Sequence, residues 1–327
     1  MLEKRLIGSI ILYKKCRITF LYKIMEDIKA LYNIKYSITH FTIKFQENSQ
    51  LNIFKESAIR GIIGQILLKK FCIEDKDCKN CAFKDNCISN NFVGMKLKYK
   101  PSFLAEEYIP SYMIICDDEK TNFKSGEELN FSIVFLSQGI ILIPEIIRAV
   151  ISAGKILGLN KYKYTLKEVL NDRNDKLYFD NKLYMKNIKI RTVKDYIENR
   201  LEISDEITMI KIMRPFRFKK EGKLATDINE KDLINLLTKR ILTLNALEGN
   251  KIDQLKEYNL KITDKEIAWE ENSRYSNRQN MKMKLGGLIG YIYLETTDLE
   301  TKKLLIAGEL LHIGKNTSFG LGDYILY

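Results

Sequence analysis

The chain has 327 residues, which is enough for two domains of ordinary size. Hydrophobic residues make up 45% and charged residues 29% of it, a composition that excludes wholesale disorder. Its 54 Lys and Arg against 42 Asp and Glu give a net charge of +12, which favours a polyanionic partner, with nucleic acid ahead of an anionic membrane surface.

The sequence disfavours both membrane insertion and secretion. The longest apolar candidate, residues 139–151, is interrupted by a proline and two charged residues, so we expect a buried helix there and no membrane partner. Residues 1–16 combine a short apolar stretch with basic residues but lack the cleavage site of a signal peptide. We therefore expect a cytoplasmic protein with an N-terminal tail over residues 1–30, the alternative being a natural start at Met25.

Alternation and helical periodicity predict six elements in the first half of the chain. Strands are expected at 36–45, 108–116, 128–136 and 162–169, and helices at 55–71 and 141–156, which gives the order β-α-β-β-α-β. Residues 171–204 are polar and are interpreted as a connecting region, with a small hairpin as one option.

The second half repeats this order. We expect a strand at 207–213, a helix at 229–249, a long hairpin of 268–285 with 287–295 across Gly286-Gly287, a helix at 298–313 and a final strand at 319–327. Asn229 and Gly249 fit the two caps of the first helix. The sequence therefore predicts an α+β protein of two tandem ferredoxin-like (βαββαβ) domains, 31–170 and 205–327, a topology that RNA-recognition modules also use.

Basic residues recur along the first arm of the expected hairpin. If 268–285 is one continuous strand, alternation sends Arg274, Ser276, Arg278, Asn280, Lys282 and Lys284 to one face. Four cations on one face repel each other unless an anion such as a phosphodiester backbone neutralises them. A solvated outer sheet face is the ordinary structural alternative, and we favour RNA binding.

A glycine-rich segment, HIGKNTSFGLG (312–322), joins the last predicted helix to the last strand. Walker-type phosphate loops need Lys and Ser or Thr after the final glycine and a helix beyond, and this segment has neither. We interpret Gly314, Lys315, Gly320 and Gly322 as a turn that approaches an RNA backbone, while a helix cap with bulge glycines is the structural alternative.

The chain has only two histidines, His40 and His312. His312 falls in the last turn of a predicted helix, where it is either an acid-base group beside the glycine-rich segment or a helix-end packing residue, and the second interpretation is favoured. His40 falls within the first predicted strand, and the structural alternative for it is a residue on the sheet surface.

Four cysteines, Cys72, Cys78, Cys81 and Cys87, form a C-x5-C-x2-C-x5-C knuckle between a helix and a strand. The polar residues between them cannot form a core, so a structural metal is expected, with zinc ahead of an iron–sulfur cluster. Disulfides are the less favoured alternative in a cytoplasmic chain.

Several segments taken in order resemble the CRISPR-associated RAMP-superfamily endoribonucleases that process precursor crRNA. The similar pieces are ESAIRGIIGQILLKKFC with the cysteines after it, GKILGLNKYKYTL, MRPFRFK, RYSNRQNMKMKLGGLIGYIYL and GELLHIGKNTSFGLGDYIL. Together they extend from about residue 56 to residue 327.

The resemblance implies two ferredoxin-like domains that bind CRISPR repeat RNA, with a C-terminal glycine-rich loop touching the RNA and other CRISPR effector subunits as further partners. It also implies metal-independent cleavage, in which a ribose 2′-hydroxyl attacks the adjacent phosphate and no cofactor takes part. Family members commonly place a histidine in or near the first helix. Residues 55–71 contain none, which leaves His40 on the preceding strand or a lysine such as Lys69 or Lys70.

Three hypotheses follow from these residues. The first is a crRNA-processing endoribonuclease that uses His40 or His312 for proton transfer. The second is a non-catalytic RAMP subunit that holds crRNA within an effector complex. The third is a metal-knuckle RNA-binding protein outside CRISPR biology.

Overall fold

The computed structural model describes residues 31–327 except 74–76, 79, 205, 253–254, 256, 272, 277–280 and 297, and for 273–276, 281–284 and 296 it describes the backbone alone. The predicted N-terminal tail, residues 1–30, lies outside the described residues. Within the described part of the chain, no helix has the length and apolar character needed to cross a bilayer.

The N-terminal unit is built on an antiparallel sheet with strand order β10-β9-β8-β1-β7-β5, with β11 also paired to β1. The strands are β1 (Lys35–Phe45), β5 (Tyr112–Ile115), β7 (Glu128–Leu136), β8 (Tyr164–Asn171), β9 (Lys176–Phe179), β10 (Lys182–Leu183) and β11 (Arg191–Thr192). Helix α2 (Glu56–Phe71) follows β1, and helix α4 (Ile143–Ile156) joins β7 to β8. The order β1-α2-β5-β7-α4-β8 agrees with the order predicted from periodicity.

Alternation along β1 decides which face of this sheet is buried. Phe41, Ile43 and Phe45 are each 1% exposed, whereas His40 just before them and Lys44 between them are exposed. The buried face receives the apolar stripe of α2 and the strongly amphipathic α4. Burial of these stripes supplies most of the stability of the unit.

The predicted connecting region, 171–204, contains regular structure. Hairpin β9–β10 extends the N-terminal sheet beyond β8, with Glu168 opposite Phe179, so this sheet continues past residue 170. Helix α5 (Val193–Ile203) follows, capped by Thr192 in a capping box with Asp195.

The C-terminal unit has strand order β15-β18-β12-β19, again all antiparallel. Its elements are β12 (Met209–Phe216), α6 (Glu230–Glu248), β15 (Leu260–Glu270), β18 (Gly287–Thr296), α7 (Leu299–Leu311) and β19 (Tyr324–Leu326). Asn229 and Gly249 cap α6 as predicted, the glycine with a left-handed φ of 98°. In both sheets the first and third strands of the unit are central, and the second and fourth flank them.

The long hairpin predicted across Gly286-Gly287 is wrong in one respect. The partner of β18 is β15, and the basic segment between them forms its own two-stranded ribbon of β16 (Ser273–Ser276) and β17 (Met281–Lys284). The register pairs Arg274 with Met283 and Tyr275 with Lys282. Because residues directly opposite share a face, the basic positions of the two strands do not line up on one face as a single strand would require.

Shorter elements complete the chain. These are β2 (Ser49–Gln50) with β6 (Asn122–Phe123), β3 (Met95–Lys96) with β4 (Tyr108–Ile109), β13 (Lys219–Lys220) with β14 (Lys223–Leu224), helix α3 (Ile88–Val93), and the 3₁₀ helices η1 (Lys84–Asn86), η2 (Ser137–Leu142), η3 (Met185–Asn187) and η4 (Thr317–Phe319).

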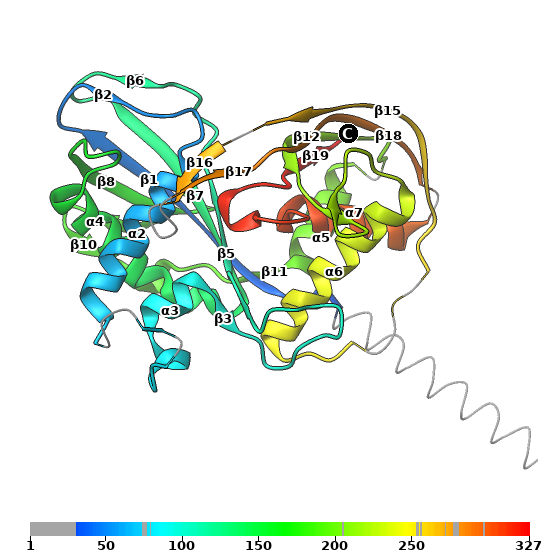
Figure 1. Cartoon of the computed structure of the whole chain (residues 1–327), viewed down its shortest axis with the longest axis horizontal. Coiled ribbons are helices and arrows are strands. Elements are labelled where there is room, and N and C mark those ends of the chain that lie inside the picture. The colour runs from blue at the N-terminus through cyan, green and yellow to red at the C-terminus, as the bar shows by residue number, and fades with distance from the viewer. Residues whose placement is uncertain are drawn as a thin grey trace, which may run out of the picture.

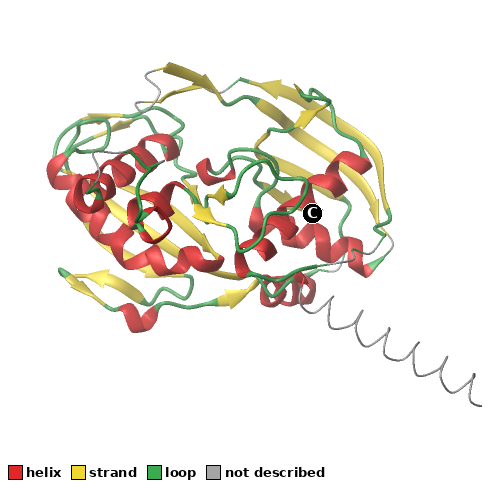
Figure 2. Cartoon of the chain, turned by 60° about the horizontal axis from the view of Figure 1, so that its bottom comes forward, coloured by secondary structure: helices red, strands yellow, loops and turns green. Residues whose placement is uncertain are grey.

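The two units lie side by side, each with its own sheet and helices (Figure 1, Figure 2). The C-terminal end of α6 reaches the N-terminal unit: the Asn245 amide donates to the Leu31 carbonyl at 2.9 Å, and the Gln138 amide donates to the Leu247 carbonyl at 3.0 Å. Buried apolar residues of both units belong to one continuous cluster. The interface is therefore packed like a core.

Candidate functional site

The glycine-rich segment 312–322 runs from the end of α7 to β19 and packs on the end of β12. The Lys315 N–H donates to the Arg217 carbonyl at 2.7 Å, and the Gly322 N–H donates to the Pro215 carbonyl at 3.1 Å. The Ile313 N–H closes the loop on the Gly322 carbonyl at 3.0 Å. These backbone bonds fix the loop against the MRPFRFK segment, residues 213–219.

The loop also touches the N-terminal unit. Phe319, 5% exposed, lies under the Arg60 guanidinium, whose carbon is 4.5 Å from the ring centroid. Arg60 comes from α2, and its Nε donates to the Tyr112 hydroxyl on β5 at 2.7 Å. The glycine-rich loop therefore contacts the N-terminal unit through a cation–π pair, and a hydrogen bond within that unit orients the cation.

Close main-chain approach is required at Gly320 and Gly322, as predicted, but the approaching chain is the protein's own. Both have left-handed φ angles, 76° and 77°. A Cβ atom would lie 2.6 Å from the Ile114 carbonyl oxygen at Gly320 and 1.8 Å from the Ile313 carbonyl oxygen at Gly322. Packing accounts for both glycines, and an RNA contact at Gly314, Gly320 or Gly322 stays a prediction.

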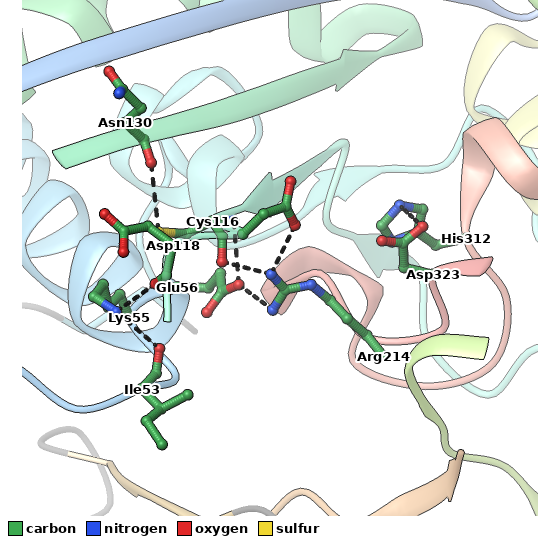
Figure 3. A network of polar contacts seen from close by, with 10 residues as sticks. Ile53, Lys55, Glu56, Cys116, Asp118, Asn130, Arg214, His312 and Asp323 are labelled. Carbon is green, nitrogen blue, oxygen red and sulfur yellow. Dashed lines mark hydrogen bonds and ion pairs between the residues drawn. The ribbon is translucent and has the colours of Figure 1, made fainter. Parts of the chain in front are cut away.

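Arg214 of β12 connects the units beside this loop (Figure 3). Its guanidinium forms an ion pair with Glu56, at the first turn of α2, and donates to the Cys116 carbonyl and to Asp117, the last at 3.1 Å. The Glu56 side chain is fully buried and also accepts from the Cys116 N–H at 3.2 Å. Burial raises the pKa of Glu56, and Arg214 opposes that effect.

His312 is buried, with 2% of its surface exposed, and it caps α7 with a positive φ of 54° and a ψ of 153°. Its Nε2 lies 3.4 Å from Asp323 Oδ1. Burial, together with the positive charges of Arg240 and Arg214, lowers the pKa of His312 to about 3. A neutral, enclosed imidazole fits the helix-end interpretation and disfavours proton exchange with a bound RNA.

His40 lies on the face of the N-terminal sheet that α2 and α4 leave open. Its Nδ1 is 2.8 Å from Ser132 Oγ on β7. Contact with its neighbours removes part of the imidazole from water, which lowers the pKa of His40. The side chain is therefore mostly neutral near pH 7. Within the described residues, no hydrogen bond or ion pair joins His40 to the glycine-rich loop, so the structure does not unite the two histidines in one site.

Basic groups gather near the loop through Arg217. Its Nη1 donates to the Gly286 carbonyl at the base of the β16–β17 ribbon, and its own carbonyl holds Lys315, which is exposed. The ribbon extends from the C-terminal sheet toward the N-terminal unit (Figure 1). Four of the predicted RNA-binding residues, Arg274, Ser276, Lys282 and Lys284, belong to its two strands, and Arg278 lies outside the described residues.

Sequence reasoning missed the residues that attach the loop to the N-terminal unit: Glu56, Arg60 and Arg214. MRPFRFK was noted only as a motif, and an acidic residue at a helix start has an ordinary explanation in the helix dipole. No spacing in the sequence connects Glu56 to an arginine in the other half of the chain.

The four knuckle cysteines all line one cavity of about 300 Å³ at the C-terminal end of α2. None of them forms a disulfide in this structure. Among the described residues, no three or more His, Cys, Asp and Glu side chains are gathered closely enough to hold a metal ion.

Comparison with known proteins agrees with this architecture. Residues 210–324 match the family model described as CRISPR-associated endoribonuclease Cas6, and residues 34–194 match a model described as an N-terminal domain. No curated protein sequence matches the chain.

Two solved structures have the same fold. A Thermus thermophilus Cas6 product complex is 13% identical with a TM-score of 0.52, over 89% of this chain and 100% of that one. A partial Cas6-RT-Cas1–Cas2 complex is 13% identical with a TM-score of 0.54, over 91% of this chain and 47% of that one. The chain thus spans less than half of the length of that relative.

Two antiparallel sheets of equal strand order, with a glycine-rich loop held between their units, make up the fold that the chain shares with the Cas6 product complex. Within that fold, the segment similar to the CRISPR-associated endoribonuclease Cas6 family is residues 210–324.

Proposed function

We propose that this protein is an endoribonuclease that cuts CRISPR repeat RNA without a metal ion and so produces mature crRNAs. The family match over residues 210–324 carries the proposal, because it includes β12, the β16–β17 ribbon and the glycine-rich loop. The net charge of +12 supports a polyanionic substrate. We infer that each sheet with its two helices is a ferredoxin-like domain, on the basis of the shared strand order.

In the proposed reaction, the 2′-hydroxyl of one ribose attacks the adjacent phosphorus, and the 5′-oxygen of the next nucleotide leaves. The products are a 2′,3′-cyclic phosphate and a 5′-hydroxyl. No water molecule is used in this step, and no metal ion takes part in it. The attacking hydroxyl must lose a proton, and the leaving oxygen must gain one. Because His40 is exposed and mostly neutral near pH 7, it is the histidine we assign to this proton transfer.

RNA binding is assigned to the cations around the glycine-rich loop. Lys315 is exposed beside Arg217, and a phosphate there would meet a positive surface. Arg274, Ser276, Lys282 and Lys284 of the ribbon, together with Arg278, would add contacts along the RNA backbone. Other CRISPR subunits are proposed as protein partners, since one structural relative is a Cas6-RT-Cas1–Cas2 complex. A substrate transcribed in the cytoplasm would place the protein there.

The test is cleavage of the repeat RNA encoded beside the gene, with EDTA added together with the RNA. We expect a cut at one position, a cyclic-phosphate end, and no cut when the scissile ribose is 2′-deoxy. His40→Ala should lower the single-turnover rate by about 10²-fold or more while RNA affinity is kept. The matched control is Thr42→Ala, the next outward position on β1, which should cut normally. If His40→Ala cuts as fast as the parent, His40 is not the proton-transfer group.

A second candidate is a non-catalytic RAMP subunit that holds crRNA. It is favoured by the absence of any histidine from α2 and by the burial of His312. Tight binding of the repeat by the parent protein, with the RNA left intact under all these conditions, would select it over the nuclease.

A further inference from the structure

We propose that Cys72, Cys78, Cys81 and Cys87 bind one structural zinc ion. The ion would fasten the knuckle, residues 72–87, to the C-terminal end of α2. The site goes beyond the proposed RNA cleavage and does not depend on it.

The first observation is that the four cysteines surround one cavity. Cys72 is the C-cap of α2, Cys87 is the N-cap of α3, and Cys78 and Cys81 lie in the loop between them. All four side chains are half-buried and line the same cavity of about 300 Å³. Cys116, the described cysteine outside the knuckle, does not line it.

The donor chemistry favours zinc. Four thiolates suit a tetrahedral ion of borderline softness, whereas calcium and magnesium need oxygen ligands. Part of the remaining lining is apolar, with Leu68, Phe71 and Phe83 among it. Four protein ligands leave no open coordination position, so the ion would stabilise the fold without taking part in chemistry.

The knuckle has little else to hold it together. Among its described residues, the one regular element is η1, a single turn of three residues. Two of its large apolar side chains, Ile73 and Phe83, are 70% and 58% exposed. A loop of this length without a core folds stably only when a cross-link or an ion replaces the missing burial.

The two ends of the knuckle are attached to different parts of the domain. Cys72 continues α2, and its N–H donates to the Leu68 carbonyl at 3.0 Å. Asp85, two residues before Cys87, accepts from the Tyr108 hydroxyl at 2.6 Å and pairs with Lys96 at 2.7 Å, both from the β3–β4 hairpin. A shared ion would therefore join α2 to the segment that carries η1, α3 and this hairpin.

The thiols must move closer together to bind one ion. No three metal-binding side chains of the described residues are gathered tightly enough as they stand, whereas zinc–sulfur bonds are about 2.3 Å long.

The experiment measures metal and thiols on the purified full chain. We expect about one zinc per chain by elemental analysis, and X-ray absorption with four sulfur neighbours at about 2.3 Å. Titration with a mercurial should release that zinc as four thiols react. The double variant Cys78→Ser/Cys81→Ser should lose the zinc, and the matched control Cys116→Ala should keep it.

Because the double variant could fail to fold, the proposal is also tested by the zinc content of the parent protein alone. Folded parent protein without zinc would overturn the proposal, as would the broad visible absorption of an iron–sulfur cluster or zinc retained by the folded double variant. None of these measurements involves RNA cleavage. A protein with a full zinc site that does not cut RNA would therefore contradict the nuclease proposal and leave the zinc proposal intact.

Discussion

At the scale of single residues, the ion pair of Arg214 and Glu56 joins the two units beside the glycine-rich loop. Its side chains are 15% and 0% exposed, so neither charge is well solvated. A buried pair of this kind adds little over apolar packing, but removal of one partner leaves the other charge without compensation.

Replacement of Arg214 by methionine should therefore be costly. We expect Arg214→Met to lower the free energy of unfolding by about 3–5 kcal/mol, because Glu56 stays buried without its cation. Adding Glu56→Gln to this variant should recover part of that loss. The exposed pair of Lys261 and Glu295 supplies the control, since Lys261→Met should change stability by less than about 1 kcal/mol. Urea denaturation measures all four proteins, and equal effects of Arg214→Met and Lys261→Met would contradict the prediction.

His312 should make stability depend on pH. Its pKa is about 3 in the folded protein against 6.5 for the free side chain, so below pH 6.5 the unfolded chain binds a proton that the folded chain does not. The contribution of His312 to the free energy of unfolding is therefore complete above pH 6.5 and is lost as pH falls toward 3.

The variant His312→Asn isolates this effect, because the asparagine side chain does not titrate. Its stability should fall less than that of the parent between pH 7 and pH 5, measured from urea midpoints. Burial raises the pKa of the neighbouring Asp323 to about 7, which acts in the opposite direction, but both proteins keep Asp323. Parallel pH curves would show that His312 is not enclosed in the folded protein.

At the scale of elements, the glycine-rich loop depends on a close approach to β5. Gly320→Ala would place a methyl group 2.6 Å from the Ile114 carbonyl oxygen and would also strain a φ of +76°. Gly222→Ala has the same backbone strain, with a φ of +80°, but open space around the new methyl group. Gly222→Ala should cost about 1–2 kcal/mol.

Gly320→Ala should cost at least about 1 kcal/mol more than Gly222→Ala, because main-chain atoms on both sides must shift. It should also weaken repeat-RNA binding, which Gly222→Ala should leave unchanged. Denaturation and filter binding measure the two effects. Similar losses of stability in the two variants would mean that the loop can move away from β5 at little cost.

The elements were largely predictable from the sequence, and their attachment to one another was not. Alternation in β1 and the caps of α6 are local signals, so the order of the elements in both units could be predicted. The β16–β17 ribbon was missed because alternation alone suggests one strand from Arg274 to Lys284. His312 could be placed at a helix end, but its lowered pKa depends in part on Arg214 and Arg240, which are distant in sequence.

At the scale of the whole molecule, the continuous buried cluster across both units predicts cooperative unfolding. Trp269, the only tryptophan, lies on β15 of the C-terminal unit, so its fluorescence reports that unit, whereas circular dichroism reports the whole chain. The two signals should change at the same urea concentration, as for a single transition. Separate midpoints would show that the units unfold independently.

The contact of Phe319 with Arg60 also has a consequence during protein synthesis. A ribosome produces α2 and β5 long before residues 312–322 leave the exit tunnel, so the surface around Arg60 is completed only when the glycine-rich loop arrives. A chain released early by a premature stop codon would contain the N-terminal sheet but not the glycine-rich loop whose Phe319 contacts Arg60. Such fragments should compete poorly with finished molecules for repeat transcripts.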